Sequence, residues 1–368
     1  MTANNVALGP GSIVGAYRIV KQIGAGGMGE VFEATHVALS RRVAIKVLHR
    51  ELSSATGMDA RMLQEASIVD GVDHPGIVRV FECGFVGDRR PWIAMELVTG
   101  ESLAQRLARD VQLPPAEVCD LVAALADILA AVHGRGIVHR DLKPENVLFA
   151  GTSHGFSLRL IDWGVARLDS AARLTLPGAT CGTPTYMSPE QAIGRDIAAP
   201  CDIYSLGVIA YEALAGHAPF DGRTLAEVVS LHLHGEAAPL SVQCPTAPPA
   251  LCELIHRMLE KAPSSRPTAA EARQSASQIA KLMRDASSEF ESYEITTKPW
   301  TSLQPLPIVE WAASLVARAR SMAIRRPAWT PGVPASLPAA WRSALIWADG
   351  RTLPSCGRDP LEPQRTRS

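Results

Sequence analysis

The stretch HRDLKPEN at residues 139–146, followed by DWG at residues 162–164, decides how this sequence folds. It brings Asp141, Lys143 and Asn146 into one short segment, and Asp162 begins the second motif. Carboxylate and amide oxygens are the ligands that Mg²⁺ prefers, and a carboxylate can also accept a proton. The two motifs therefore indicate one polar site in the middle of the chain.

Upstream lies the glycine-rich sequence GAGGMG at residues 24–29. A GxGxxG pattern also occurs in Rossmann-type turns, but these require a helix directly afterwards, and residues 30–34 have the pattern of a strand. A glycine-rich β-hairpin instead lets backbone amides approach phosphate oxygens with no Cβ in the way. The alternative is a flexible hairpin that binds no ligand.

Farther along, the apolar segment VAIK at residues 43–46 ends in Lys46. A lysine at the end of a strand directs a charge into whatever that strand lines, although an ordinary edge lysine has the same pattern. Glu65 lies in the next predicted helix, from which it can reach back and form an ion pair with Lys46. A solvated glutamate is the alternative.

The periodicity of apolar residues predicts an α+β chain. Alternating, β-branched segments predict five strands near the N-terminus, at residues 17–23, 31–35, 43–48, 77–85 and 92–97. Helical periodicity predicts one helical insert among them and five further helices, at residues 58–70, 117–133, 202–215, 225–233, 250–259 and 269–283.

Composition excludes several classes of protein. The 368 residues are 47% hydrophobic and 20% charged, which permits a sizeable core, and a net charge of -1 gives no basic field for nucleic acid. Seven cysteines without a CxxC pair argue against a disulfide framework or zinc site and favour a reducing compartment. We see no secretory signal and no uninterrupted apolar run of about 20 residues, so we expect no membrane span and a cytoplasmic location.

Taken in order, these motifs and SPE at residues 188–190 resemble the eukaryotic-like (Hanks-type) serine/threonine protein kinases of bacteria. The resemblance covers about residues 17–284. It implies a bilobal protein-kinase fold, with a five-stranded antiparallel sheet and one helix in the N-lobe (17–97) and a mostly helical C-lobe (101–284). It also implies transfer of the ATP γ-phosphate to serine and threonine hydroxyls of proteins in signal transduction.

The resemblance implies a role for each polar residue of the site. Phosphoryl transfer needs positioning and charge neutralisation more than covalent work by the protein. Asp141 would orient the incoming hydroxyl and accept its proton, and Lys143 would contact the γ-phosphate. Asn146 and Asp162 would bind Mg²⁺, with Mn²⁺ as a substitute. Thr183 resembles the residue that bridges this aspartate and lysine.

An ATP site follows from the same resemblance. Lys46, held by Glu65, would bind the α- and β-phosphates, and the glycine-rich hairpin would cover them. Met95 is the expected gatekeeper, and backbone groups of Glu96 and Val98 would bind the adenine edge. Plain core packing is the alternative for the apolar members. The remaining expected residues of the ATP site are Ile23, Gly24, Gly26, Gly29, Val31, Ala44 and Leu148.

The segment between Asp162 and Glu190 suggests regulation. An arginine at the position of Arg140 commonly pairs with a phosphorylated loop residue in this family, and the candidates are Thr175 and Thr180. Unmodified loop threonines are the alternative.

Five positions carry structural expectations or depart from the family pattern. Glu190 and Arg266 resemble a buried pair that anchors the segment, and Asp202 resembles the carboxylate that braces the catalytic loop. Trp163 replaces the usual phenylalanine, where a larger indole affects the balance between active and inactive states. Arg140 is also expected to have a structural role.

Residues 1–16 are expected to form an N-terminal extension and residues 285–368 a partly disordered tail rich in Pro, Trp and Arg, without a transmembrane helix. Within it, residues 308–326 have the spacing of a basic amphipathic helix that could dock on an anionic membrane or a partner; packing on the C-lobe or lack of structure is the alternative. A homodimer is compatible with the family.

Two rival functions remain open. One is a pseudokinase scaffold, although Lys46, Asp141, Asn146 and Asp162 are all present. The other is a small-molecule phosphotransferase, which usually lacks the KPE sequence at residues 143–145.

Overall fold

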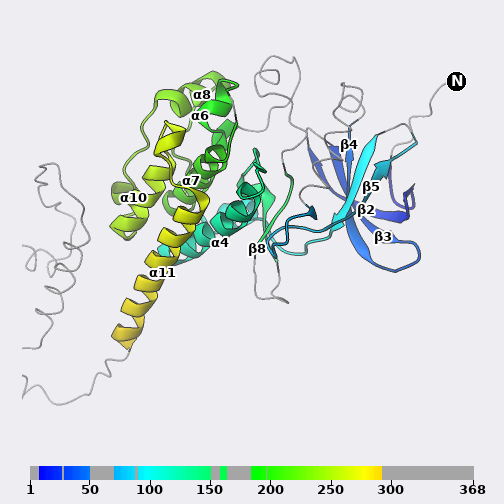
Figure 1. Cartoon of the computed structure of the whole chain (residues 1–368), viewed down its shortest axis with the longest axis horizontal. Helices are drawn as coiled ribbons and strands as arrows, with labels where there is room; N and C mark the ends of the chain where they lie inside the picture. Colours follow the sequence, from blue (N-terminus) through cyan, green and yellow to red (C-terminus); the bar gives the residue numbers. More distant parts are fainter. Residues whose placement is uncertain are drawn as a thin grey trace, which may run out of the picture. The chain divides into compact units, whose positions relative to one another are not determined.

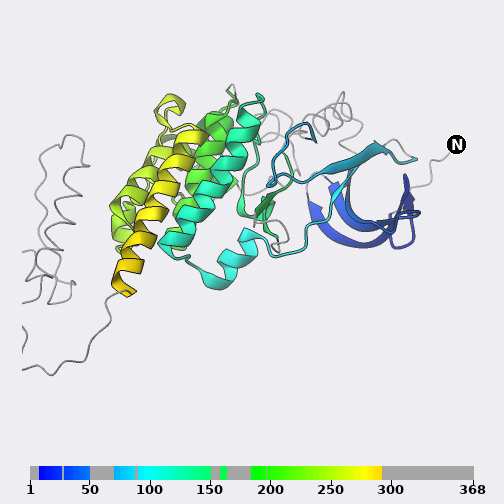
Figure 2. The same ribbon diagram turned by 60° about the horizontal axis from the view of Figure 1, so that its bottom comes forward.

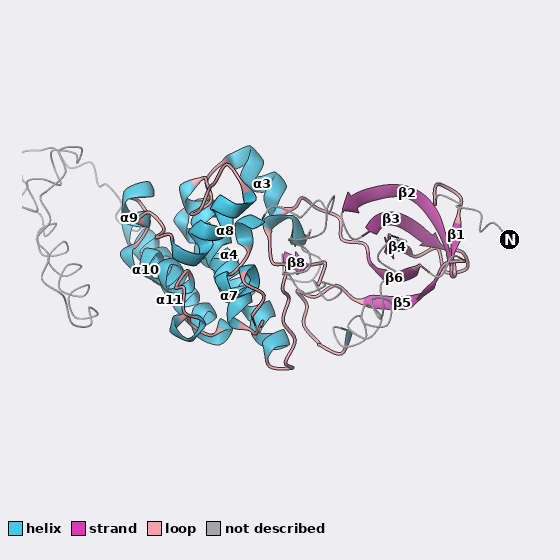
Figure 3. Ribbon diagram, turned by 90° about the horizontal axis from the view of Figure 1, so that it is seen from above, coloured by secondary structure: helices cyan, strands magenta, loops and turns pink. Residues whose placement is uncertain are grey.

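The computed structural model describes residues 8–26, 29–49, 70–87, 90–150, 158–163, 184–195 and 197–291. Within these residues, strands dominate up to residue 97 and helices dominate after residue 102 (Figures 1 and 3). This division follows the change in apolar periodicity, from alternation in the first part to helical spacing in the second. The predicted two-lobe α+β fold is therefore confirmed.

The N-lobe contains an antiparallel sheet in the order β1-β2-β3-β4-β6-β5. Its strands are β1 (Ile13–Val14), β2 (Tyr17–Gly26), β3 (Gly29–His36), β4 (Arg42–Leu48), β5 (Val80–Phe85) and β6 (Pro91–Glu96). The fully buried side chains of Ile19, Phe32 and Ile45 form the centre of its core. Trp92 closes this core and packs edge-on against Tyr17, with 6.1 Å between ring centroids.

Six strands, and not the predicted five, form this sheet in the described residues. The additional strand, β1, pairs Val14 with Tyr17 and Ile13 with Arg18. The turn between them requires Gly15, which has a φ of +56° and whose Cβ would lie 2.4 Å from the ring of Trp92. A strand of two residues shows no alternation, so its sequence pattern could not reveal it.

A second difference concerns the predicted strand 77–85, because β5 begins only at Val80. The backbone N–H of Leu160 donates to the carbonyl of Gly76 at 2.8 Å, and Ile77 forms an isolated parallel bridge with Leu160. Val72 and Ile77 are buried in the core of the C-lobe. The segment before β5 therefore packs with the C-lobe, although it lies between N-lobe elements in the sequence.

The predicted N-lobe helix, residues 58–70, falls almost entirely outside the described residues; only Asp70, at its end, is described and is helical.

Eight α-helices build the described part of the C-lobe (Figure 1). They are α3 (Leu103–Asp110), α4 (Pro115–His133), α6 (Pro189–Ala192), α7 (Pro200–Ala215), α8 (Leu225–His234), α9 (Leu240–Gln243), α10 (Pro249–Met258) and α11 (Ala269–Glu291). The five predicted C-lobe helices correspond to α4, α7, α8, α10 and α11. Helices α3, α6 and α9 were not predicted, because each is too short to show a clear periodicity.

Helix α7 is the centre of the C-lobe, since nearly all of its residues are buried. A helix that is apolar on every side must be surrounded by other elements. Gly207 lets α10 approach closely, because a Cβ at this position would lie 2.9 Å from Cβ of Met258. The first turn of α7 carries Asp202, and its central position fixes that carboxylate within the lobe.

Helices α4 and α11 lie side by side (Figure 2). Small residues at Ala272, Ala276 and Ala280 are fully buried in this contact region. Helix α11 continues to Glu291, past the predicted domain end at residue 284. Among the described residues, no helix has the length and apolar character required to cross a membrane.

Candidate active site

Asp202 holds the backbone of the segment between α4 and the short strand β7 (Val147–Phe149). Its carboxylate accepts hydrogen bonds from the backbone N–H groups of His139, at 2.8 Å, and Arg140, at 2.9 Å. It also accepts one from His133 Nε2 at 2.8 Å. Arg140 has a φ of 65°, which is unfavourable for an arginine, and these bonds help to maintain that conformation.

The carboxylate of Asp202 is 1% exposed and stays ionised. Burial alone would raise its pKa, but the hydrogen bonds from His133 and from the backbone N–H of His139 favour the charged form, and the pKa is lowered. A buried carboxylate with these donors acts as a fixed brace. The structure thus pairs Asp202 with the loop that the sequence analysis assigned to it.

His139 links the same loop to the end of strand β8 (Leu158–Leu160). Its Nδ1 accepts from the backbone N–H of Asp141 at 3.3 Å, so its Nε2 carries the hydrogen and donates to the carbonyl of Ile161 at 3.2 Å. The imidazole is fully buried, and burial lowers its pKa. His139 is therefore neutral and orients Asp141. Its ring packs against that of Trp163, with 4.7 Å between the ring centroids.

Asp141, Lys143 and Asn146 converge as the sequence analysis expected. Lys143 Nζ lies 3.3 Å from Asp141 Oδ2, and Asn146 Nδ2 donates to the backbone carbonyl of Asp141 at 2.8 Å. The 3-10 turn Pro144–Asn146 brings the asparagine back over the loop. Since the amide nitrogen of Asn146 is used, its oxygen is the atom that remains to bind a cation.

Lys46 and Asp162 meet although 116 residues separate them in the sequence. Lys46 Nζ lies 2.9 Å from Asp162 Oδ1, with 15% and 33% of the two side chains exposed. Burial would raise the pKa of Asp162, but Lys46 and then Lys143 outweigh it, so the pKa is lowered. Asp162 has a φ of 55°, a conformation that aspartate tolerates better than most residues. Four charged side chains are thus grouped around one site.

Most of the expected ATP-site residues lie along β2, β3, β4 and β6, whereas Val98 follows β6 and Leu148 lies on β7. Lys46 is opposite Val31, which in turn is opposite Gly24, and Ala44 is opposite Met95. Gly29 cannot be replaced without a backbone shift, because its Cβ would lie 2.1 Å from the Val47 carbonyl oxygen. The remaining expected residues are the exposed Ile23 and the half-buried Glu96, Val98 and Leu148, with Gly26 at the end of β2.

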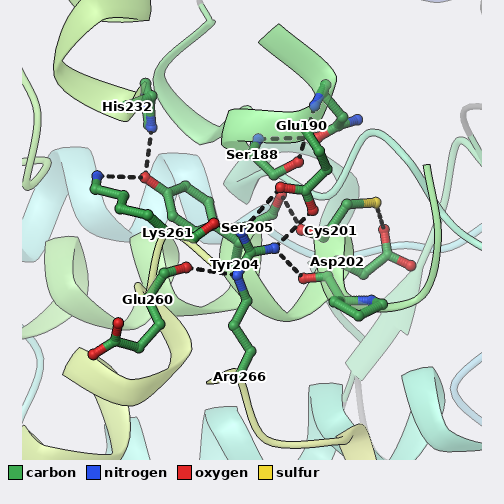
Figure 4. A network of polar contacts seen from close by, with 12 residues as sticks. Ser188, Glu190, Cys201, Asp202, Tyr204, Ser205, His232, Glu260, Lys261 and Arg266 are labelled. Atoms are coloured by element: carbon green, nitrogen blue, oxygen red, sulfur yellow. Dashed lines mark hydrogen bonds and ion pairs between the residues drawn. The ribbon is translucent and has the colours of Figure 1, made fainter. Parts of the chain in front are cut away.

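A second polar network centres on Arg266 and connects α6 with the first turns of α7 (Figure 4). Arg266 forms two bonds to the carboxylate of Glu190, at 2.7 and 2.9 Å. Its remaining three N–H groups donate to the backbone carbonyls of Pro200, Glu260 and Lys261, and its guanidinium lies 4.8 Å above the ring of Tyr204. All five donors are therefore used, which fixes the start of α6.

Helix α6 also contacts the loop that carries Arg140 and Asp141. Gln191 Nε2 donates to the backbone carbonyl of Arg140 at 2.8 Å, and Gln191 forms a capping box with Ser188. The sequence analysis did not single out Gln191. Its signal was the S-x-x-Q spacing of a capping box, which predicts a helix start but not the bond to Arg140.

Three other contacts were missed because their partners are distant in sequence. Glu96, at the end of β6, lies 3.5 Å from Nε of Arg159 on β8. Tyr186 donates to Glu212 at 2.7 Å, and its backbone carbonyl accepts from Ser205 at 2.7 Å.

Several predicted residues lie outside the described residues: Glu65, Thr175, Thr180 and Thr183, together with the tail segment 308–326.

Comparison with known proteins gives consistent results. The model of the protein kinase domain family matches residues 17–276. The serine/threonine-protein kinase pkn2 of Myxococcus xanthus is 41% identical over 293 residues, which cover 78% of this chain and 34% of that protein. PknA of Mycobacterium tuberculosis is 38% identical over 259 residues, covering 69% of this chain and 59% of that protein. The chain thus spans about a third to three fifths of the length of these two relatives.

Solved structures resemble the chain as well. The crystal structure of the PknI kinase domain from Mycobacterium tuberculosis has a TM-score of 0.58 and 28% sequence identity. The match covers 75% of this chain and 99% of the PknI kinase domain.

Proposed function

The chain belongs to the protein kinase family, and from this premise we propose that it transfers the γ-phosphate of ATP to serine and threonine hydroxyls of proteins in bacterial signal transduction. The observation that carries the proposal is the grouping of Asp141 and Lys143, 3.3 Å apart, with the ion pair of Lys46 and Asp162. Phosphoryl transfer depends on this kind of positioned charge more than on covalent participation of the protein.

In the proposed reaction, Asp141 receives and orients the hydroxyl of the acceptor. His139 supports this role, because it holds the backbone of Asp141 in a buried, uncharged contact. Lys143 is close enough to Asp141 to place a positive charge beside the transferred phosphoryl group. Lys46 holds the α- and β-phosphates, and the glycine-rich hairpin covers them.

Membership of the family implies use of ATP and a divalent cation. The donor set fits such a cation: Asp162 is an ionised carboxylate, and the amide oxygen of the buried Asn146 remains available. We propose Mg²⁺, with Mn²⁺ as a substitute, because both ligands are hard oxygen donors. When bound, the cation neutralises negative charge on the phosphates.

Serine and threonine specificity and loop control are proposals of the same kind. Lys143 two residues after Asp141 is typical of serine/threonine kinases, and pkn2 and PknA carry that description in their names. We expect autophosphorylation at Thr175 or Thr180, with the phosphate paired to Arg140. Thr183 is proposed to bridge Asp141 and Lys143.

The organisation of the chain is proposed on its sequence pattern. Residues 17–284 would form the kinase domain and residues 285–368 a tail, with segment 308–326 able to dock on a membrane surface or a partner. Reliance on ATP, together with free thiols at the five described cysteines, supports a cytoplasmic location. Homodimer formation is compatible with the family.

Autophosphorylation tests the proposal. The purified full-length protein is incubated with Mg-ATP beside an Asp141→Asn variant, and the phosphorylated sites are mapped by mass spectrometry. Phosphate on Thr175 or Thr180 in the wild type, with a rate at least about 100-fold lower in the variant, is the expected result. If the wild type binds ATP but neither protein incorporates phosphate, and added basic or acidic test proteins are not labelled either, a scaffold function replaces the proposal.

A further inference from the structure

His49 forms a hydrogen bond that spans two non-adjacent strands of the N-lobe sheet. Its Nε2 lies 2.9 Å from the backbone carbonyl oxygen of Gly26. A carbonyl oxygen only accepts, so Nε2 carries the hydrogen and donates it. In the register of the sheet, Gly26 on β2 is opposite Gly29 on β3, which is opposite Leu48 on β4. His49 follows Leu48 directly, so its side chain reaches from β4 past β3 to β2.

Gly26 pairs with Gly29 across the hairpin, but an added Cβ at this position would meet nothing within 4 Å among the described residues. The pairing of β2 with β3 also shifts register between Gln22 and Gly24, just before this residue. Because glycine has the largest backbone freedom of any residue, a specific contact at Gly26 restrains the end of β2 more than the backbone alone would.

The other end of this hydrogen bond is fixed. Val47 and Leu48 are each 1% exposed, so β4 is anchored in the core up to the residue before His49. The same strand carries Lys46, three positions earlier, which pairs with Asp162 at 2.9 Å. The contact from His49 to Gly26 therefore sets the position of the end of β2 relative to Lys46 on β4.

We propose that His49 is a positioning residue that holds the glycine-rich hairpin, through the Gly26 carbonyl, over the site of the nucleotide phosphates. The inference rests on the proposed ATP binding and deepens it, since it assigns the hairpin's position to one side chain. It predicts a selective effect: loss of the bond weakens binding of the phosphates and leaves binding of the adenosine part unchanged.

The test compares two ligands on the full-length protein by isothermal titration calorimetry. Mg-ADP carries phosphates but has no γ-phosphate to transfer, and adenosine has no phosphates. In His49→Phe, which keeps a ring but has no donor, we expect the Kd of Mg-ADP to rise about fivefold, while the Kd of adenosine changes less than twofold. His49→Gln retains an N–H donor and is expected to recover most of the lost affinity.

His36→Phe is the matched control. His36 lies at the opposite end of β3, and its Nδ1 accepts from the backbone N–H groups of Ala38 and Leu39 at 3.2 and 3.0 Å. It is therefore also a histidine that binds backbone, but far along the strand from the glycine-rich turn. We expect its substitution to leave both Kd values unchanged, with thermal unfolding recorded for every variant.

The outcomes separate the inference from the function on which it rests. If the wild type binds neither Mg-ADP nor adenosine, the proposed ATP binding is wrong and the role of His49 falls with it. If the wild type binds both, and His49→Phe binds both equally well or loses affinity for both alike, the positioning role is wrong while the proposed function stands. A failure of His49→Gln to recover affinity also contradicts the proposed hydrogen bond.

Discussion

The ion pairs Glu190–Arg266 and Lys46–Asp162 have similar lengths, 2.7 and 2.9 Å, but very different surroundings. Arg266 is completely buried and uses all five of its N–H groups. The Lys46–Asp162 pair has a carboxylate that is one-third exposed. The first pair has a structural role, whereas the proposed function requires the second to open and exchange partners with a nucleotide and a cation.

The difference teaches that bond length does not separate structural from functional ion pairs. Breaking a fully buried pair leaves an uncompensated charge in the protein interior, which is costly. An exposed pair contributes little to stability, because water replaces the lost partner. With 15% and 33% of its side chains exposed, the Lys46–Asp162 pair lies between these two cases. Such a pair can therefore open for a ligand with a smaller loss of stability than a fully buried pair.

Replacing Arg266 should give the largest effect on stability. In Arg266→Ala, Glu190 stays buried without its partner, so the free energy of unfolding should fall by about 3–5 kcal/mol. Urea unfolding followed by circular dichroism measures this loss. Arg266→Lys keeps the charge but not the five-donor fork, so its free energy of unfolding should lie between those of the wild type and Arg266→Ala. This variant also tests the prediction if the alanine variant does not fold.

Arg273→Ala is the matched control for Arg266. Arg273 pairs with Asp127 at 2.8 Å, but its side chain is 52% exposed. Its loss should cost less than about 1 kcal/mol. Equal losses in the two arginine variants would contradict the distinction drawn between buried and exposed pairs.

Replacing Lys46 should instead have its main effect on activity and a smaller effect on stability. In Lys46→Met we expect phosphoryl transfer to fall about 100-fold, because a positioned charge on the phosphates is lost. The free energy of unfolding should fall by less than in Arg266→Ala, because Asp162 is one-third exposed and keeps the nearby charge of Lys143. Lys21→Met removes an exposed lysine from the same sheet, 3.7 Å from Glu33, and should leave transfer unchanged. A large loss of stability in Lys46→Met would show that this pair too is structural.

His232, which lies beside Arg266, should make a smaller and pH-dependent contribution to the free energy of unfolding. His232 Nδ1 lies 2.9 Å from the hydroxyl of the buried Tyr204, to which Lys261 Nζ also approaches at 3.4 Å (Figure 4). Burial, followed by the charge of Lys261, lowers the pKa of His232 to about 4. The folded protein therefore keeps His232 neutral, whereas the unfolded chain binds a proton below about pH 6.5.

It follows that this histidine removes stability as the pH falls from about 6.5 to about 4, by an amount on the order of 2–3 kcal/mol. Urea unfolding measured across this pH range should show that the free energy of unfolding falls less steeply with decreasing pH in His232→Gln than in the wild type. His139 and His256, whose pKa values are also lowered by burial, act in the same direction and leave a residual slope. Identical slopes in the two proteins would rule out the contribution of His232.

The sequence predicted features that depend on neighbouring residues better than features that depend on contacts between distant residues. Helices such as α4 and α7 were predicted to within a few residues, because periodicity is a local property. Helix α3 was missed, although Ser102 and Gln105 form a capping box that the sequence displays. Strand β1 was missed because it depends on Gly15 fitting against Trp92, a contact between distant residues.

The same limit applies to the site. Motifs identified Lys46 and Asp162 as members of one site, but nothing local indicated that they would bond to each other. The predicted pairing of Lys46 with Glu65 stays a prediction, because Glu65 lies outside the described residues. The contacts of Gln191 with Arg140 and of His49 with Gly26 depend on how separate elements meet, and that information is not carried by either residue's neighbours.

The segment before β5 has a consequence for how the domain can be divided. Val72 and Ile77 are buried in the C-lobe core, and Gly76 accepts a backbone hydrogen bond from Leu160, yet all three precede strands of the N-lobe sheet. An N-lobe excised at residue 97 would carry these apolar residues without their partners, and the remaining fragment would lose part of its own core. The two lobes are therefore not interchangeable modules, and a chimaera that joins lobes from two relatives would have to exchange this segment together with the C-lobe.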